Sequence, residues 1–330
     1  MLHHTLKTLL SLLVISLLLC GGSFAMEKTS ADANKTAIVI AAFGTTYPSA
    51  VDSLLAIVRD VETAYPNTLV QMAFTSNIIR KKWHGRADDQ NYRSSHPQVP
   101  DYFYQIKNLL GTLADLQDQG YKTIVVQPTH LTHGEEFEDV KAYVDGLRSI
   151  KTLKERWRPF NKIALGRPLM GTWGDRFPYA EDLQKLATSL AADAKLAEQQ
   201  QATLIYMGHG NDHLSTGLYY ELELLMNQLY PQVRTLVGLV EGHPNFDELL
   251  TKLQAGNNKK TLLKPLMIVA GDHASNDMAG DEEDSWKTQL QKAGYQVKPV
   301  MQGLGDNAEV RQIFVDHLSD AATEAGVELR

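Results

Sequence analysis

The most regular feature of the chain is an apolar run followed by a helical pattern. Residues 37–43 form a continuous apolar stretch, as expected of a parallel strand that is covered on both faces. Pro48 then opens a helix, because proline is well tolerated in a first helical turn. Apolar residues follow at helical spacing, at Val51, Leu54, Leu55, Val58 and Val61. The pattern predicts a strand and then an amphipathic helix.

The same alternation recurs along the chain. Further strands are expected at residues 69–74, 123–127, 163–165, 203–207, 235–240, 261–269 and 296–300, with helical patterns between them. Strands that alternate with helices indicate an α/β fold with mainly parallel sheets. The length suits two domains, so we expect an N-terminal lobe at 36–160 and a C-terminal lobe at 161–330.

The two halves share local motifs. Phe-Gly-Thr at 43–45 corresponds to Met-Gly-His at 207–209, and the prolines at 128 and 265 are each followed six residues later by a glycine. In this alignment Thr45 corresponds to His209, and Glu136 to His273. We interpret the correspondence as an internal duplication. The alternative is that any two strand–helix units share a strand–glycine pattern.

Three residues with metal-binding side chains stand just past predicted strands. His209, Glu241 and His273 follow one another at equal intervals of 32 residues. The carboxyl ends of parallel strands meet at one edge of a sheet, so these side chains are expected to converge. Two imidazoles and a carboxylate suit a divalent ion such as cobalt, iron, nickel or zinc, and leave coordination positions open for exchange.

Residues 1–25 are predicted to be a signal peptide. A weakly basic start precedes an apolar run at 9–19 and a small-x-small cleavage site at 23–25. The run is too short to span a bilayer, so we expect cleavage and a periplasmic protein. The alternatives are an uncleaved anchor, a lipoprotein held through Cys20, and a true start at Met26 that leaves the protein cytoplasmic. Cys20 is the only cysteine, which excludes disulfides and thiolate ligands after cleavage.

The net charge of −7, without a basic tail, argues against general nucleic-acid binding. One stretch, residues 75–100, is nevertheless basic and interleaved with aromatic residues. Its side chains are Arg80, Lys81, Lys82, Arg86 and Arg93, with Trp83 and Tyr92. Guanidinium groups beside aromatic faces suit a flat ligand with several carboxylates. A solvated basic face is the alternative.

Several motifs together resemble one family. They are Gly-His-Gly at 208–210, Val-Glu-Gly-His-Pro at 240–244, Pro-Leu-Met-x-Val-Ala-Gly-Asp-His-Ala-x-Asn-Asp at 265–277, Thr-Ser-x-x-Ile-Arg at 75–80 and Gln-Pro-Thr-His at 127–130. Over essentially the whole mature chain, the sequence resembles the anaerobic CbiK-type cobaltochelatases. These class II chelatases insert Co²⁺ into sirohydrochlorin without ATP, on the route to vitamin B12. Typical members are cytoplasmic, and the predicted signal peptide departs from that pattern.

The resemblance implies two Rossmann-like lobes with an active cleft between them. It further implies that His209 and His273 are catalytic and bind the metal, with Glu241 as the acidic third ligand. Cations of the cleft would face the carboxylates of the tetrapyrrole. The expected substrate-binding residues are Arg80, Lys81, Arg86, Arg167, Thr45 and Glu136.

The other histidines have several interpretations. His96, in a loop before a proline, is a candidate axial ligand for haem b, shared across an interface of a homo-oligomer that we expect to be a dimer or tetramer. His130 and His133, beside acidic residues, form either a second cation site or cleft positions. His243 is a candidate hydrogen-bond partner for the ligand set. His84 and His317 are expected on the surface.

Two other functions stay open at this point. The same ligands would serve Fe²⁺, which makes a ferrochelatase for sirohaem or haem an alternative within the same chemistry. An exported carrier that delivers a metal or haem to a transporter is an alternative of another class. Export favours the carrier, whereas the basic stretch favours a substrate with many carboxylates.

Overall fold

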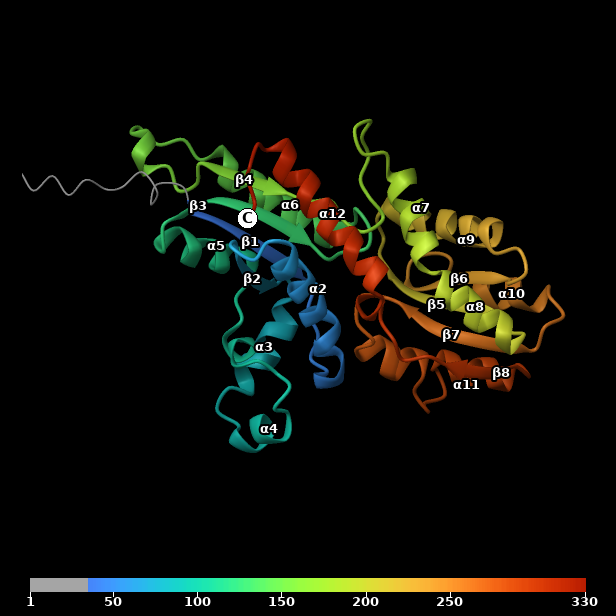
Figure 1. Cartoon of the computed structure of the whole chain (residues 1–330). Coiled ribbons are helices and arrows are strands. Elements are labelled where there is room, and N and C mark those ends of the chain that lie inside the picture. Colours follow the sequence, from blue (N-terminus) through green and yellow to red (C-terminus); the bar gives the residue numbers. More distant parts are fainter. Residues whose placement is uncertain (1–34) are drawn as a thin grey trace, which may run out of the picture. The chain divides into compact units, whose positions relative to one another are not determined.

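The computed structural model describes residues 35–330, which form one compact unit (Figure 1). The expected signal peptide, with Cys20 and Met26, lies outside the described residues. Within residues 35–330, no helix is both long enough and apolar enough to cross a membrane.

The first lobe is built on four parallel strands in the order β2-β1-β3-β4. They are β1 (Lys35–Ala42), β2 (Leu69–Phe74), β3 (Tyr121–Pro128) and β4 (Lys162–Leu165). In β1 every residue from Ala37 to Ala42 is fully buried, because the strand is central and helices cover both faces of the sheet. The continuous apolar run of the sequence is explained by this position.

The second lobe repeats the arrangement. Its parallel strands are β5 (Thr203–Gly210), β6 (Thr235–Glu241), β7 (Lys260–Leu266) and β8 (Gln296–Pro299), in the order β6-β5-β7-β8. Each lobe therefore has its first strand beside the second and third, as an internal duplication requires. All the predicted strands are confirmed. β7 ends earlier than expected, because the Met267 and Ile268 carbonyls turn away to accept the amides of Leu304 and Gly305.

Helices connect the strands and cover the sheets. The first lobe contains η2 (Pro48–Ala50), α2 (Val51–Ala64), α3 (Asn77–Gly85), α4 (Gln90–Ser95), η3 (Asp101–Gln105), α5 (Leu109–Asp118), α6 (Glu135–Ser149) and η4 (Glu155–Trp157). Later in the chain come α7 (Tyr179–Ser189), α8 (Ala191–Gln200), η5 (Leu214–Thr216), α9 (Gly217–Leu229), α10 (Phe246–Gln254), the π-helical turn η6 (Ala274–Met278), α11 (Trp286–Lys292), η7 (Leu304–Asp306) and α12 (Ala308–Glu324). The helix predicted after Pro48 is confirmed as η2 and α2.

The expected boundary between lobes, at 160/161, separates β4 from its own sheet. β4 pairs in parallel with β3 of the first sheet, from Thr123 opposite Lys162 to Val126 opposite Leu165. The C-terminal helix α12 also returns to the first lobe, where it packs against α2, β3 and β4 (Figure 1, red). Sheet membership therefore extends the first lobe through β4 and adds α12 to it.

Candidate functional site

A cavity of about 290 Å³ lies where the carboxyl ends of the central strands meet. Its walls include Phe43 and Thr45 after β1, His130 after β3, His209 at the end of β5 and His273 after β7. Both lobes contribute, as expected for a ligand site at the carboxyl edge of parallel sheets. The cleft implied by the family resemblance is thus present as a cavity lined by the predicted histidines.

His209 and His273 lie edge to face beside each other in the lining of this cavity. Their ring centroids are 4.9 Å apart and the rings are nearly perpendicular, at 79°. The Nδ1 atom of His209 lies 2.8 Å from the Gly210 carbonyl, and that of His273 lies 2.5 Å from a carboxylate oxygen of Asp277. Since each Nδ1–H donates to an acceptor, each ring keeps the lone pair of Nε2 for another partner. The two imidazoles are therefore oriented as metal ligands commonly are.

Glu241 lies on the Nδ1 side of the His209 ring. Its Oε2 atom is 4.0 Å from Nδ1 of His209, and its side chain is 60% exposed. Among residues 35–330, no three His, Cys, Asp or Glu side chains converge closely enough to hold a metal ion. The role of Glu241 as a third ligand therefore stays a prediction.

Glycines permit the close approach of His209 and Glu241. Gly210 has φ of +77°, and a Cβ atom there would lie 1.9 Å from the carbonyl oxygen of Glu241. Gly242, at φ +83°, likewise lies against the Asn211 carbonyl. Only glycine adopts these conformations in so little space. The Gly-His-Gly and Glu-Gly motifs thus have a structural cause, because they let the ends of β5 and β6 come together.

The loop that carries His273 is fixed by a polar network to the first lobe. The Tyr47 hydroxyl donates to Asp272 at 2.8 Å, and the Asn276 amide donates to both Tyr47 and Asp272 at 3.1 Å. The hydrogen bond to Asp272 is the largest cause of the raised pKa of Tyr47. This network, together with the bond to Asp277, holds the imidazole of His273 toward the cavity.

The expected substrate-binding residues divide into two groups. Thr45 is buried and, with Glu136, lines the cavity. Arg80, Lys81 and Arg86 do not line it. The Arg80 guanidinium bonds to Asn77 on its own helix, and Lys81 is exposed.

Arg86 instead supports the cavity wall. Its guanidinium donates to the Thr46 carbonyl at 2.8 Å, and lies 4.9 Å from the ring centroid of Trp83 and 4.5 Å from that of Tyr92. The indole of Trp83, fully buried, donates to the Thr45 carbonyl at 2.7 Å. The interleaved aromatic and basic residues are thus occupied with each other. Lys82, which we did not single out for the substrate, is the basic residue of this stretch that lines the cavity.

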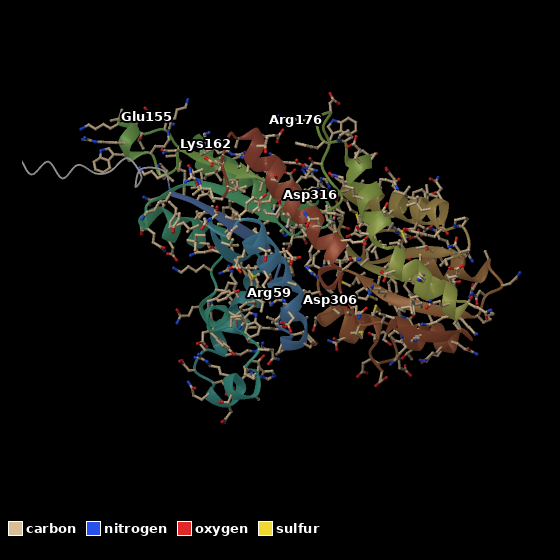
Figure 2. The ribbon with its side chains drawn as sticks, viewed as in Figure 1. Arg59, Glu155, Lys162, Arg176, Asp306 and Asp316 are labelled. Atoms are coloured by element: carbon tan, nitrogen blue, oxygen red, sulfur yellow. The ribbon has the colours of Figure 1, made fainter. Side chains whose placement is uncertain are left out.

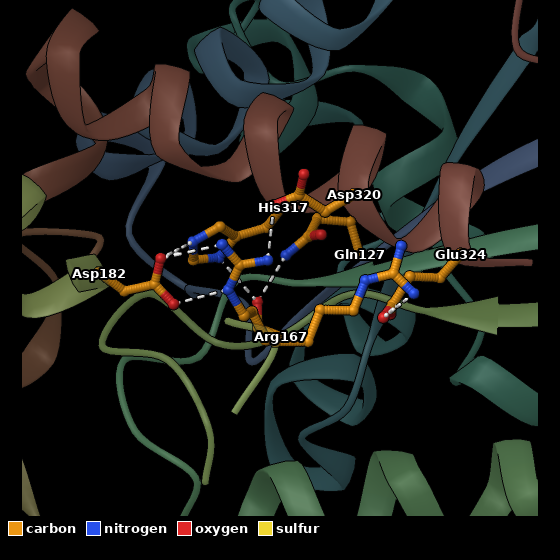
Figure 3. Close-up of polar contacts among 7 residues, drawn as sticks. Gln127, Arg167, Asp182, His317, Asp320 and Glu324 are labelled. Atoms are coloured by element: carbon orange, nitrogen blue, oxygen red, sulfur yellow. Dashed lines mark hydrogen bonds and ion pairs between the residues drawn. The ribbon is translucent and has the colours of Figure 1, made fainter. Parts of the chain in front are cut away.

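Arg167 lies outside the cavity of His209 and His273. It lines a separate cavity of about 370 Å³ and is buried among partners (Figure 3). Its guanidinium donates to both carboxylate oxygens of Asp182, at 2.6 and 2.9 Å, to Asp320 at 2.7 Å, and stacks on Phe177. A guanidinium with these partners has little left to offer a substrate.

His317 corrects another expectation. It is fully buried rather than on the surface, because α12 lies against the first sheet. Its Nε2 is 3.0 Å from Asp182 and its Nδ1 3.2 Å from the Arg167 carbonyl (Figure 3). His84, by contrast, is exposed as expected.

His130 and His133 do not share a cation site. His133 bonds to Glu138 and lines the cavity of Arg167, whereas His130 lines the cavity of His209. Burial lowers the pKa of His130 to about 4, so the ring is neutral near pH 7. Neither of its ring nitrogens has a hydrogen-bond partner within residues 35–330. His243 is mostly exposed and bonds to Glu248 rather than to the ligand set.

Two residues of the site were missed at the level of sequence. Asp277 is the last residue of the motif at 265–277. It follows His273 by four residues, a spacing of about one helical turn that brings two side chains together. Phe43 stands just past β1, and its ring centroid is 6.4 Å from that of His209. The ring is 43% exposed, unusual for phenylalanine, and it lines the cavity. Its place in the repeated strand–glycine motif was the available signal.

Two equivalent α/β lobes, with paired imidazoles at the carboxyl edge of one sheet, define a chelatase-type protein. A model of the family described as cobalt chelatase (CbiK) matches residues 36–323. The chain belongs to this family.

Relatives agree over almost the full length. A sirohydrochlorin cobaltochelatase of Salmonella typhimurium is 32% identical over 293 residues, covering 88% of this chain and 98% of the relative. The sirohydrochlorin cobaltochelatase CbiKC of Nitratidesulfovibrio vulgaris is 28% identical over 289 residues, covering 88% and 91%. The solved structure of SirB from Bacillus subtilis with Fe³⁺ shares the fold, with a TM-score of 0.55 at 15% identity, covering 90% of this chain and all of SirB.

Proposed function

We propose that the protein inserts Co²⁺ into sirohydrochlorin without ATP. The observation that carries this proposal is the edge-to-face pair of imidazoles in the lining of one cavity, each with its Nδ1 atom hydrogen-bonded and its Nε2 atom left for another partner. Neutral nitrogen ligands suit an ion that must be given up, whereas thiolates would retain it more strongly. Family membership and the two named relatives support cobalt as the metal and sirohydrochlorin as the acceptor.

The same atoms can serve both halves of the reaction. Insertion replaces two pyrrole N–H protons by one Co²⁺, so two protons must be accepted. When the ion leaves Nε2 for the macrocycle, the lone pair of that nitrogen becomes free to accept a proton. Each resulting imidazolium has a carboxylate on its Nδ1 side, Glu241 for His209 and Asp277 for His273. We infer that two imidazole–carboxylate pairs accept the two protons.

The test is spectroscopic. Purified protein is mixed with metal-free sirohydrochlorin and Co²⁺, and the absorbance change of the macrocycle is followed. We expect acceleration over the protein-free reaction, and loss of most of it in His209→Ala and His273→Ala. His84→Ala is the matched control, because this histidine is exposed and away from the cavity. No acceleration by the unaltered protein, with Co²⁺ retained by it, would instead favour a metal carrier.

We also propose that Fe²⁺ is an alternative substrate metal and that the protein acts in the periplasm. Parallel assays with the two metals test the first statement. Fractionation of cells, with the N-terminal residue of the purified protein determined, tests the second. A protein found in the cytoplasm would refute export, whereas residue 26 at the N-terminus fits both cleavage and a start at Met26.

His96 is our proposed haem ligand. Its Nδ1 is 2.8 Å from the Tyr92 carbonyl, and its ring stacks on that of Tyr92 with centroids 4.2 Å apart. The bond fixes the ring and leaves Nε2 for a haem iron. We expect His96→Ala to lose any Soret band of the purified protein while retaining insertion activity. A retained band would assign the haem to another residue.

A further inference from the structure

We propose that the amino edge of the first sheet binds the surface of an anionic phospholipid bilayer. The surface, which we call the basic edge, is formed by the loop at 150–161 between α6 and β4. Three large apolar side chains of this loop are exposed: Leu153 at 108%, Trp157 at 67% and Ile150 at 38%. Leucine and tryptophan exposed on one short loop indicate a partner with an apolar interior.

The loop is held in place despite this exposure. Phe160 is buried in the core of the first lobe, and the Asn161 amide donates to the Lys122 carbonyl at 2.7 Å. The Lys122 ammonium in turn donates to the carbonyl of Arg156 at 3.3 Å. The apolar side chains are therefore presented outward by a fixed backbone, and their burial against a partner requires no refolding.

The charge of the basic edge indicates which partner. Within residues 150–162, five residues are basic and one, Glu155, is acidic, although the whole chain carries −7. Lys151, Lys154 and Arg156 are exposed. The Arg156 guanidinium lies 5.3 Å from the ring centroid of Trp157, so cation and aromatic ring form one patch. Lysine and arginine beside an interfacial tryptophan suit anionic headgroups above acyl chains.

The position in the fold agrees with a membrane partner. The strands of the first sheet are parallel, so β1, β3 and β4 all begin at this edge. Lys35, at the start of β1, pairs with Tyr121 at this edge. Figure 2 marks the edge with Glu155 and Lys162. A bilayer contacting the basic edge would leave the cavity of His209 clear, because that cavity lies at the carboxyl ends of the strands.

The experiment measures partitioning of the full chain onto vesicles of phosphatidylcholine, with and without phosphatidylglycerol, by co-sedimentation. The N-terminus is the same in all variants, so any contribution from residues 1–34 cancels in the comparison between them. We expect the preference for phosphatidylglycerol to fall at least about ten-fold in Lys151→Gln/Lys154→Gln/Arg156→Gln. Brominated lipids should quench the fluorescence of the unaltered protein more than that of Trp157→Phe.

The matched control is Trp173→Phe, which removes an exposed tryptophan from the loop between β4 and α7. It should leave quenching by brominated lipid unchanged. Equal partitioning of the triple variant and the unaltered protein would overturn the proposal. So would a shift of the triple variant to a smaller species in sedimentation velocity, since the basic edge would then be an interface between copies of the chain. Insertion activity of the variants is expected to be unchanged.

Discussion

Replacing Arg167 by leucine distinguishes a buried structural ion pair from a substrate contact. The guanidinium is 8% exposed and bonds to Asp182 and Asp320 (Figure 3). Removing one partner of a buried pair leaves the others uncompensated, which costs roughly 3–5 kcal/mol. We therefore expect Arg167→Leu to lose about 3 kcal/mol or more of its free energy of unfolding, measured by urea denaturation at pH 7.

The pH dependence of this loss can be worked out from Asp182. Burial alone would raise its pKa, but hydrogen bonds from Arg167 and His317 outweigh burial and lower the pKa to about 2, from an ordinary value of 3.8. The difference corresponds to about 2 kcal/mol of stability. Because the folded-state pKa is depressed, this contribution is present above pH 3.8 and is lost as the pH falls toward 2. The gap between the unaltered protein and Arg167→Leu should therefore narrow below pH 4.

The control is Arg176→Leu, because Arg176 is 65% exposed and pairs with the partly exposed Glu324 at 3.1 Å. An exposed pair contributes about 0–1 kcal/mol, so this variant should be nearly as stable as the unaltered protein. If Arg167→Leu kept its full stability but lost affinity for the tetrapyrrole, the structural assignment would be refuted. Arg167 would then face the substrate, as the sequence led us to expect.

Two further substitutions test the site itself. Asp277→Asn should lower Co²⁺ affinity and the insertion rate by about 10- to 100-fold, because His273 loses the partner that orients it. The control Asp284→Asn, beyond the π-helical turn, should change neither. If Asp277→Asn inserted cobalt as fast as the unaltered protein, Asp277 would have no role in the site. Phe43→Ala should raise KM for the macrocycle about five-fold with a stability change below about 0.5 kcal/mol, because the ring is partly exposed and lines the cavity. A change confined to kcat would contradict contact between Phe43 and the bound macrocycle.

Periodic patterns predicted the fold well, because the burial of each strand determines which of its own residues are apolar. The fully buried run of β1 and the helical spacing of α2 needed no distant information. His209 and His273 were predictable for a related reason, since parallel strands bring their carboxyl ends to one edge. The placement of Arg167 was not predictable locally. Its partner Asp320 is 153 residues away, on a helix whose return to the first lobe no periodicity indicates.

The duplicated frame is used differently in its two halves. After β5, glycine geometry holds His209 beside Glu241 at the open end of the strand. After β1, the equivalent turn at Thr45 is fixed by two side chains from the connection between β2 and β3, the indole of Trp83 and the guanidinium of Arg86. The connection between β2 and β3 thus stabilises the part of the cavity wall formed by Thr45 and Thr46.

Arg86 and Arg167 were expected to line the cleft but do not line the cavity of His209. A substrate with many carboxylates must therefore bind differently from the expectation. Of the basic residues considered, Lys82 lines the cavity and is itself exposed. Burying several carboxylates without cations would be costly, since an isolated buried carboxylate is strongly disfavoured. We therefore expect the macrocycle to place its pyrrole nitrogens beside His209 and His273 and its carboxylates at the solvent-exposed rim. In this arrangement the paired imidazoles, rather than a basic pocket, determine which reaction the cavity supports. Substitutions of residues at the rim of the cavity should therefore change KM more than kcat.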